Sequence, residues 1–276
     1  MMRTDLHIHT YYSDGNSSPA EMVALAKQNG VKLISVTDHD NMNGSKEAKE
    51  ACLNAGIIAV DGIEISAYDN AKIHVLGYNV NADCTAFKRY YEDSLKGAEE
   101  RVLDILKKLS KHGVHLSIYD VERERKCKFS PLHSSYVARA ACRKGYGSNP
   151  GRFYVDYLNL GRCAYSNLNR PSPKEAVKLI CDCGGVAVLA HPGRIDFDSD
   201  RKINLIKELK DCGLGGIEAV YSAHTDSETA YYKEIAEKFS LLVTGGSDTH
   251  FSEGNRKIGT PEFYPDEKLL TALKLI

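Results

Sequence analysis

Four short segments of this chain end in clusters of histidine and aspartate, and each cluster follows an apolar, strand-like run. The segments are Asp5-Leu6-His7-Ile8-His9-Thr10, Thr37-Asp38-His39-Asp40, Ala190-His191-Pro192 and Gly246-Ser247-Asp248-Thr249-His250. Barrel-type α/β enzymes carry their reactive groups at the carboxyl ends of their strands. Four clusters in the same position relative to a strand therefore predict a site that holds more than one metal ion.

The remaining composition allows one large folded unit. With 276 residues, of which 42% are hydrophobic, the chain can bury a full core and is not expected to be globally disordered. Its start has no apolar signal-peptide stretch, and no later segment is long and apolar enough to span a bilayer. We therefore expect a soluble, cytoplasmic protein with no membrane partner. The eight cysteines include no Cys-x-x-Cys pair and are interpreted as small, reduced, buried residues.

Strand-like runs alternate with helical patterns along most of the chain. Ser18 is a plausible N-cap for the first helix, and Pro19 suits its first turn. This alternation is typical of parallel β/α units, and a count of about seven strands favours a barrel slightly short of the eight-stranded form. The expected strands lie near residues 6–8, 32–37, 57–65, 72–78, 186–189, 216–220 and 241–244.

A basic, mainly helical region interrupts the alternation. A long helical pattern runs from about Asp83 to His112, and residues 114–169 lack strong strand signals. We interpret 98–168 as a small helical insertion that covers the site, and 1–97 with 169–276 as a discontinuous metal-binding barrel. Residues 95–170 contain fifteen Lys and Arg against seven Asp and Glu. This excess suits a polyanionic substrate, although a solvated helical surface would give the same excess.

The candidate metal ligands are all histidines or carboxylates. His7 and His9 lie two apart on a strand, so their side chains point to the same face. Glu64 lies between two isoleucines, where an unpaired charge would be costly to bury and a metal ion would remove that cost. His74 also has apolar neighbours and, taken alone, would be interpreted as a core histidine. A set without cysteine favours zinc, manganese or ferrous iron. The candidates are His7, His9, Asp14, His39, Glu64, His74, His191, Asp248 and His250.

The D-L-H-I-H-T, T-D-H-D, A-H-P and G-S-D-T-H segments, in this order, resemble those of the polymerase and histidinol phosphatase (PHP) superfamily. The resemblance covers essentially the whole chain. It implies an α/β fold with a distorted seven-stranded (βα)7 barrel and two or three divalent ions. The ligand sets that it implies are His7, His9, Glu64 and Asp248 for one ion, a bridging Glu64 with His74 and His191 for a second, and Asp14, His39 and His250 for a third.

The predicted reaction is hydrolysis of a phosphate ester by water activated at a pair of ions. No nucleophilic Ser or Cys motif is evident, so no phosphoenzyme is expected. Asp40 and His224 are the candidate catalytic groups; His224 would serve as the acid for the leaving oxygen, with a structural histidine at a helix start as the alternative. Arg194, three residues after a predicted ligand, suits a bidentate phosphate contact. Ser222 is a further candidate substrate contact.

The position of the insertion resembles the superfamily branch that acts on nucleotides and RNA ends. The segment Tyr136-Val137-Ala138-Arg139-Ala140 resembles the insert helix of that branch, with Tyr136 where many relatives have histidine. The resemblance makes Tyr136 and Arg139 candidate substrate contacts. His133 is a third candidate, because it could substitute by position for the missing histidine.

We therefore expect a metal-dependent phosphoesterase that removes the 3′-phosphate of a nucleoside 3′,5′-bisphosphate and could also trim short RNA from its 5′ end. A histidinol-phosphate-type phosphatase is an alternative, although it would not need the insertion. A non-catalytic, metal-stabilised binding module is disfavoured because all nine positions hold competent ligands. An amide-bond hydrolase would usually need a carboxylated lysine or a different histidine spacing. The expected partner is a nucleotide or short oligoribonucleotide, and no obligate protein partner is evident.

Overall fold

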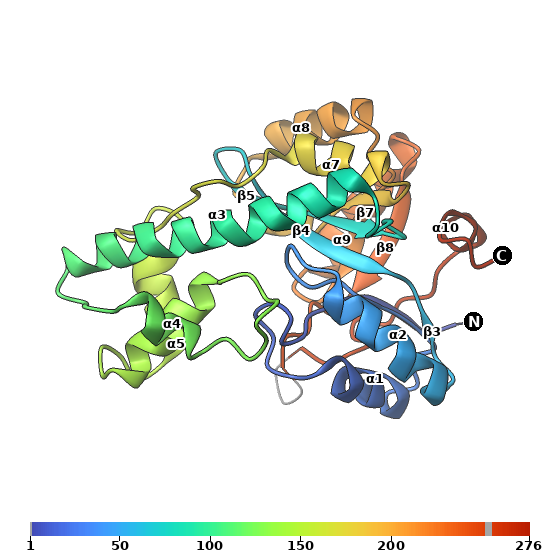
Figure 1. The fold of residues 1–276 in the computed structure, drawn as a ribbon. Coiled ribbons are helices and arrows are strands. Elements are labelled where there is room, and N and C mark those ends of the chain that lie inside the picture. Colours follow the sequence, from blue (N-terminus) through green and yellow to red (C-terminus); the bar gives the residue numbers. More distant parts are fainter. Residues whose placement is uncertain (1, 252–255) are drawn as a thin grey trace.

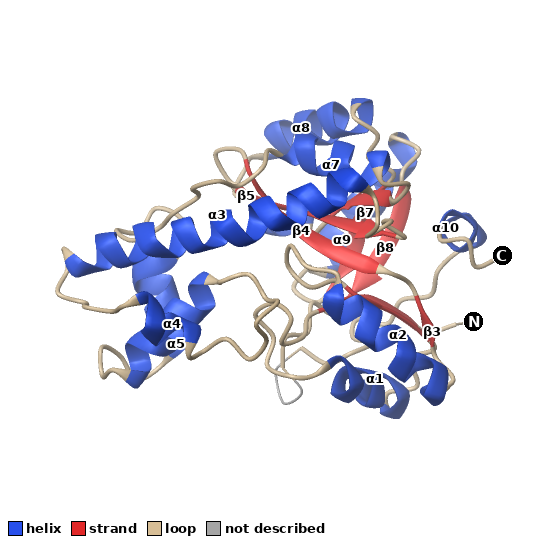
Figure 2. Cartoon of the chain, viewed as in Figure 1, coloured by secondary structure: helices blue, strands red, loops and turns tan. Residues whose placement is uncertain are grey.

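The computed structural model describes residues 2–251 and 256–276, and its strands form an α/β arrangement with two sheets (Figures 1 and 2). One sheet has three strands in the order β1-β2-β3, and the other has five in the order β4-β5-β6-β7-β8. The strands are β1 (Thr4–Ile8), β2 (Leu33–Val36), β3 (Ile58–Ala59), β4 (Gly62–Tyr68), β5 (Lys72–Tyr78), β6 (Val186–Leu189), β7 (Gly216–Tyr221) and β8 (Leu242–Gly246).

The strand directions are only partly parallel. The first three strands are parallel to one another, and β6, β7 and β8 are parallel as well. In contrast, β5 is antiparallel to both of its neighbours, β4 and β6. The expectation of parallel β/α units throughout is therefore wrong at β5. The link between β4 and β5 is the short turn 69–71, with Asn70 at a φ of 53°, whereas a parallel pair needs a crossover of a dozen or more residues.

The two sheets meet where their strands end. One isolated parallel bridge joins Ile8 to Thr249, and another joins His39 to Glu64. The His9 N–H donates to the carbonyl of Thr249 at 2.9 Å, in line with the first bridge. These contacts place the segment after β8 beside the end of β1, and the segment after β2 beside β4. Because the described strands form two bridged sheets of three and five, the single closed seven-stranded barrel stays a prediction.

Several helices begin at a residue whose side chain caps them. Ser18 and Glu21 form a reciprocal capping box at the start of the first helix, and Ser172 and Glu175 form another. In the described part of the chain, no helix combines the length and the apolar character needed to cross a membrane. The helices are α1 (Pro19–Gln28), α2 (Asn43–Ala55), α3 (Thr85–Ser110), α4 (Ile118–Glu122), α5 (Ser134–Arg143), α6 (Pro150–Phe153), η1 (Tyr154–Leu158), α7 (Pro173–Asp182), η2 (Pro192–Arg194), α8 (Ser199–Asp211), α9 (Asp226–Lys238) and α10 (Glu267–Ala272).

Hydrophobic clusters lie between the sheets and on their outer faces. Leu6 and Val188 belong to the cluster between the sheets. Met22 of α1 packs in the same cluster as Ile34 of β2, on the outer face of the three-stranded sheet. The apolar faces of α7, α8 and α9 cover the five-stranded sheet, where Ile180 is fully buried. The strand ends that carry the histidines are therefore supported by packed hydrophobic clusters between the sheets and on their outer faces.

A further cluster lies in the helical region after β5 and contains no strand residue. Leu106 and Leu109 of α3 belong to it, together with Val137 of α5. The other end of α3 reaches the five-stranded sheet, where Phe87 joins the cluster of that sheet. A single helix thus connects both cores (Figure 1). The division at residue 98 falls inside α3, so the two-part organisation stays a prediction that the separate cluster supports.

The cluster in the helical region should be a stabilising core in its own right. Leu109 is fully buried, whereas Leu103 on the same helix is 47% exposed. We expect Leu109→Ala to lower the free energy of unfolding by about 2–5 kcal/mol, because it leaves a cavity. Leu103→Ala should change it by about 0.5 kcal/mol or less. Urea unfolding followed by circular dichroism measures both, and equal losses would contradict this account of the core.

Candidate metal centre

Glu64 of β4 lies at the centre of a group of imidazoles and is fully excluded from solvent. Its two carboxylate oxygens face different histidines. The Oε2 atom lies 3.3, 3.2 and 3.1 Å from ring nitrogens of His7, His9 and His39. The Oε1 atom lies 2.9 and 3.0 Å from ring nitrogens of His74 and His191. One carboxylate is therefore shared by five histidines that come from four separate parts of the chain.

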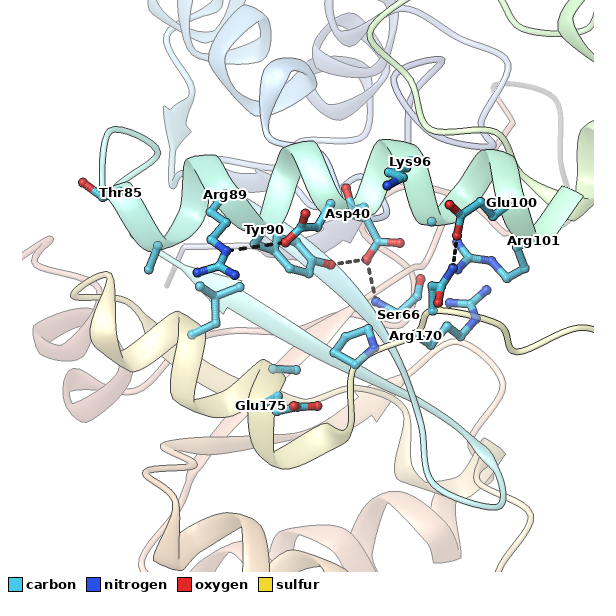
Figure 3. A pocket seen from close by; sticks show the side chains of 18 residues that line it. Asp40, Ser66, Thr85, Arg89, Tyr90, Lys96, Glu100, Arg101, Arg170 and Glu175 are labelled. Carbon is cyan, nitrogen blue, oxygen red and sulfur yellow. Dashed lines mark hydrogen bonds and ion pairs between the residues drawn. The ribbon is translucent and has the colours of Figure 1, made fainter.

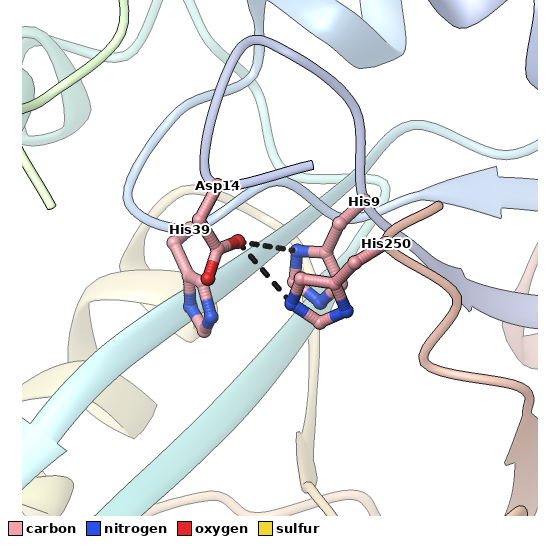
Figure 4. Close-up of side chains that lie close together, drawn as sticks. All are labelled: His9, Asp14, His39 and His250. Atoms are coloured by element: carbon pink, nitrogen blue, oxygen red, sulfur yellow. Dashed lines mark ion pairs between the residues drawn. The ribbon is translucent and has the colours of Figure 1, made fainter. Parts of the chain in front are cut away.

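Asp14 and His250 extend this group on one side (Figure 4). The Asp14 Oδ1 atom lies 3.2 Å from Nε2 of His250 and 4.0 Å from Nδ1 of His9. The rings of His9 and His250 are stacked, with their centroids 4.1 Å apart. His39 lies on the other side of Asp14, so two histidines and a carboxylate converge around the His9 ring.

All nine predicted ligands belong to one or more groups with metal-binding geometry, and the ligand atoms of each group lie within 4.8 Å of one another. The groups overlap more than the sets implied by the resemblance. His9 joins the Asp14 group as well as the Asp248 group, and His39 joins both Asp14 and Glu64. The four groups are His9, Asp14, His39 and His250; His7, His9 and Asp248; His7, Glu64 and His191; and His39, Glu64 and His74.

The donor atoms themselves fit divalent cations. The Nε2 atoms of His7 and His9 face each other at 3.1 Å, and Oε2 of Glu64 is buried without a hydrogen-bond donor. Burial alone would raise the pKa of Glu64, but the neighbouring charges of His39, His74 and His7 hold it well below its usual range. Converging lone pairs around a buried charge are what a cation would satisfy. The mixture of nitrogen and oxygen donors suits zinc, manganese or iron.

Glu218 of β7 holds two of the histidines and was missed by the sequence analysis. Its Oε1 atom lies 2.9 Å from Nδ1 of His7, and its Oε2 atom accepts the backbone N–H of His191 at 2.8 Å. A carboxylate on Nδ1 turns the Nε2 atom of His7 towards the centre, as is usual behind metal-binding imidazoles. The signal was present in the sequence: Glu218 lies in an apolar strand, the pattern that singled out Glu64.

Asp5 and Asp248 join the end of the chain to its beginning. The carboxylate of Asp5 accepts the backbone N–H groups of Ser247 at 3.0 Å and Gly259 at 2.8 Å. Tyr221 donates its hydroxyl to Oδ2 of Asp248 at 2.7 Å. Arg256 contacts the same Asp248 oxygen, and the sequence analysis identified neither partner. These contacts leave Oδ1 of Asp248 free to face His9, at 3.1 Å.

The aspartates on either side of His39 accept hydrogen bonds from other segments of the chain. Asp38 accepts hydrogen bonds from Thr10 and Ser13 and so fixes the loop after β1. Asp40 accepts from the Tyr90 hydroxyl at 2.6 Å and from a backbone N–H of β4 at 2.8 Å. Both carboxylates are therefore used to hold loops, and the predicted catalytic role of Asp40 gains no support from these contacts.

Three residues in the segments that carry ligands after β2, β6 and β8 adopt the left-handed backbone region. They are Asp40 with a φ of 54°, His191 with 27° and Asp248 with 53°. Non-glycine residues are uncommon there, and such strain concentrates at functional sites. In this chain, the unusual backbone turns each chain segment sharply where it enters the histidine group.

His224 contacts the segment after β6 rather than the group of ligands. Its Nδ1 atom donates to the carbonyl of Ala219 at 3.0 Å, and its Nε2 atom accepts the N–H of Gly193 at 3.1 Å. Because both nitrogens are occupied, the geometry favours the structural alternative over the catalytic acid. Arg194 is exposed at the end of η2, and Ser222 has a buried hydroxyl without a partner among the described residues.

The insertion provides three predicted substrate contacts, which lie in different surroundings. The His133 ring lies 5.8 Å from the His39 ring, and its buried Nε2 atom has no hydrogen-bond partner in the described structure. Burial lowers the pKa of His133 to about 4. Tyr136 is buried and its hydroxyl contacts the carbonyl of Ser13, so it fixes the loop before Asp14. Arg139 stacks on Tyr136 and lines a separate small groove.

Comparison with known proteins places this arrangement in a family. The model of the PHP domain matches residues 5–145. A phosphoribosyl 1,2-cyclic phosphate 1,2-diphosphodiesterase from Eggerthella lenta is 32% identical, over 90% of this chain and 94% of the relative. The chain belongs to the PHP domain family.

Other relatives of this PHP protein have related names. A 5′-3′ exoribonuclease from Haemophilus influenzae is 30% identical over 92% of both chains. A 3′,5′-nucleoside bisphosphate phosphatase from Chromobacterium violaceum is 28% identical over 96% of this chain and 93% of that one. The solved structure of an amidohydrolase from Chromobacterium violaceum has a TM-score of 0.88 at 25% identity and covers 99% of this chain and 96% of its own. This PHP protein is therefore a hydrolase of phosphate esters that uses divalent metals.

Replacement of the shared carboxylate of Glu64 should lower the metal content of the centre. We expect Glu64→Gln to lose at least one ion, because both of its oxygens face ligand nitrogens and an amide provides only one uncharged acceptor. Elemental analysis after dialysis measures the metal content of the folded protein. Glu262→Gln, at an exposed ion pair with Arg3, is the matched control. Unchanged metal content in Glu64→Gln would exclude this carboxylate as a ligand.

Glu218 should influence the metal without binding it. We expect Glu218→Gln to weaken metal binding by about 10- to 100-fold, because such supporting carboxylates orient the ligand imidazole. Titration of the metal-free protein with manganese against a competing chelator gives the affinity. Glu208→Gln, at an exposed ion pair with Lys174, should bind as tightly as wild type. An affinity equal to wild type for both variants would assign Glu218 a purely structural role.

Proposed function

We propose that this PHP protein hydrolyses the 3′-phosphate ester of nucleoside 3′,5′-bisphosphates and releases a 5′-nucleotide and phosphate. The observation that carries the proposal is the buried Glu64, which presents one oxygen to each of two histidine groups. A carboxylate in this position suits two neighbouring cations. Paired cations are a common means of hydrolysing phosphate esters.

The proposed ligand sets are those that the resemblance to the PHP superfamily implies, and their members lie together in overlapping groups. His7, His9 and Asp248 would hold one ion, and His74 and His191 would hold a second, with Glu64 shared between them. Asp14, His39 and His250 would hold a third. Manganese, zinc and iron all suit these donors. When bound, the ions supply a Lewis acid for the phosphoryl oxygens and a nucleophilic water at neutral pH.

The surrounding residues prepare the site for this chemistry. Glu218 and the backbone carbonyl of Asp248 orient His7 and His250 through their Nδ1 atoms. His133 presents an unpaired nitrogen next to the ligand His39, which suits a contact to the substrate. Arg194 is exposed shortly after His191 and suits a phosphate oxygen. The nucleophile is water, so no side chain is required to form a covalent bond.

The nucleotide part of the proposal is supported by the relatives and by charge. Their names describe a phosphoribosyl cyclic phosphate, an RNA and a nucleoside bisphosphate as substrates of those proteins. All three substrate types contain a phosphate ester and more negative charge than a simple monophosphate. The excess of basic residues between 95 and 170 in this chain favours such a substrate electrostatically.

A second candidate is cleavage of a cyclic phosphate diester of phosphoribose. The observation that favours it is the 32% identity with the Eggerthella lenta diphosphodiesterase over 257 residues. A diester and a monoester could use the same ions, because both reactions begin with attack of water on phosphorus. The 5′ end of a short RNA is a further possible substrate for the same reason.

Turnover of defined substrates distinguishes these functions. The manganese-loaded protein would be given adenosine 3′,5′-bisphosphate, phosphoribosyl 1,2-cyclic phosphate, a 5′-phosphorylated trinucleotide RNA and histidinol phosphate. We expect kcat/KM for the bisphosphate to be highest by about tenfold or more, equivalent to about 1.4 kcal/mol of transition-state binding. Asp248→Asn should be inactive on all four. Faster turnover of the cyclic phosphate or of histidinol phosphate would contradict the proposal and identify that compound as the preferred substrate.

A further inference from the structure

A large cavity lies beside the metal centre, between α3 and the start of α7. Its volume is about 880 Å³, and Asp40 forms part of its wall at the end nearest the histidines. Arg101 of α3 and Arg170, just before α7, line the same wall. Figure 3 shows these two side chains reaching towards each other from opposite sides. A space of this size accommodates a small organic molecule.

Two positive charges are held close together there. Arg101 is half-buried, and one of its guanidinium nitrogens donates to the carbonyl of Leu168 at 2.8 Å. Burial and the neighbouring charge of Arg170 lower the pKa of Arg101 to about 10. Two like charges in a partly dry site repel each other. The charge of Asp40 offsets part of this cost for Arg101, and an anion bound between the two guanidinium groups would offset more.

Neither arginine forms an ion pair with a carboxylate among the described residues, although most other arginines do. Arg89 on the same helix pairs with Asp93, and Arg143 in the insertion pairs with Glu124. The acidic residues of the cavity are already engaged. Their partners are Tyr90 and Ser66 for Asp40, Arg89 for Asp93, Asn169 for Glu100 and Ser172 for Glu175.

Both arginines also line a small second cavity, together with residues next to the metal centre. This space of about 30 Å³ is lined by Arg101, Arg170, Asp40 and His133. His133 in turn lies against the ring of His39. A substrate with one phosphate at the metals and a second anionic group a few bonds away could therefore reach both places at once.

We propose that Arg101 and Arg170 form the binding site for the second, non-reacting phosphate group of the substrate. This inference rests on the proposed function and extends it, because it explains how a bisphosphate is preferred over a monophosphate. Two guanidinium groups can bind one phosphate through several charge-assisted hydrogen bonds. The substrate class is thus a compound with two phosphate groups, of which only one is removed.

Two substrates that differ by one phosphate test the site. The variants Arg101→Gln and Arg170→Gln would be assayed on adenosine 3′,5′-bisphosphate and on adenosine 3′-phosphate, with manganese bound. We expect kcat/KM to fall by about 10- to 100-fold on the bisphosphate, the usual range for hydrogen bonds to a charged group. On the monophosphate it should fall by less than about threefold, because that substrate has no group for the arginines.

Matched variants separate this effect from damage to the fold. Arg89→Gln removes an exposed charge from the rim of the same cavity and should leave both substrates unaffected. Arg170→Lys keeps the charge and should recover part of the lost activity. Thermal unfolding shows whether Arg101→Gln has loosened the contact with Leu168. If it has, the turnover of both substrates by Arg170→Gln decides whether the arginines bind the second phosphate.

Binding of adenosine 5′-phosphate distinguishes failure of the site from failure of the proposed function. This ligand carries only the second phosphate, and calorimetry gives its Kd for each protein. A Kd raised by about tenfold or more in both Gln variants supports the site. This holds even if the wild-type protein does not hydrolyse the bisphosphate. In that case only the proposed function is rejected. A Kd unchanged in both variants would overturn the site, whatever the turnover numbers are.

Discussion

The burial of one negative charge explains much of this structure. Glu64 lies in a strand without access to water, where an isolated carboxylate would be very unfavourable. Five imidazoles provide the compensation. Four come from the last part of a strand or the segment after it, and the fifth, His74, comes from the first half of β5. The directions and lengths of the neighbouring strands are therefore tied to the position of this single side chain.

The antiparallel direction of β5 follows from the same requirement. In the β4–β5 pair, Ser66 lies opposite His74, which makes Glu64 the diagonal neighbour of His74 on the same face. A short hairpin gives this register directly. A parallel crossover would place the next strand start at the opposite end of the sheet, far from the carboxyl ends of the others. The local reversal thus supplies a histidine that a strictly alternating barrel would not.

The sequence could predict local elements and the ligand types, but not most of the long-range partners. Strands 72–78 and 186–189 have the predicted bounds, and Ser18 caps the first helix as predicted, because apolar runs and capping residues are local signals. Glu218 was predictable by the same reasoning as Glu64. The partners of Asp38 and Asp40 were not, because neighbours in sequence gave no information about Thr10 or Tyr90. The proximity of Arg101 and Arg170 likewise depends on how α3 crosses the segment before α7.

The contact between Asp5 and Ser247 has a consequence for how the protein is made. These residues are 242 positions apart, so the earliest ligands leave the ribosome long before the last ones exist. Such distant contacts form late and slowly, because the entropy of closing a long loop must be overcome first. The complete set of ligands therefore exists only after the two ends of the set have met, so complete metal binding is coupled to the late steps of folding.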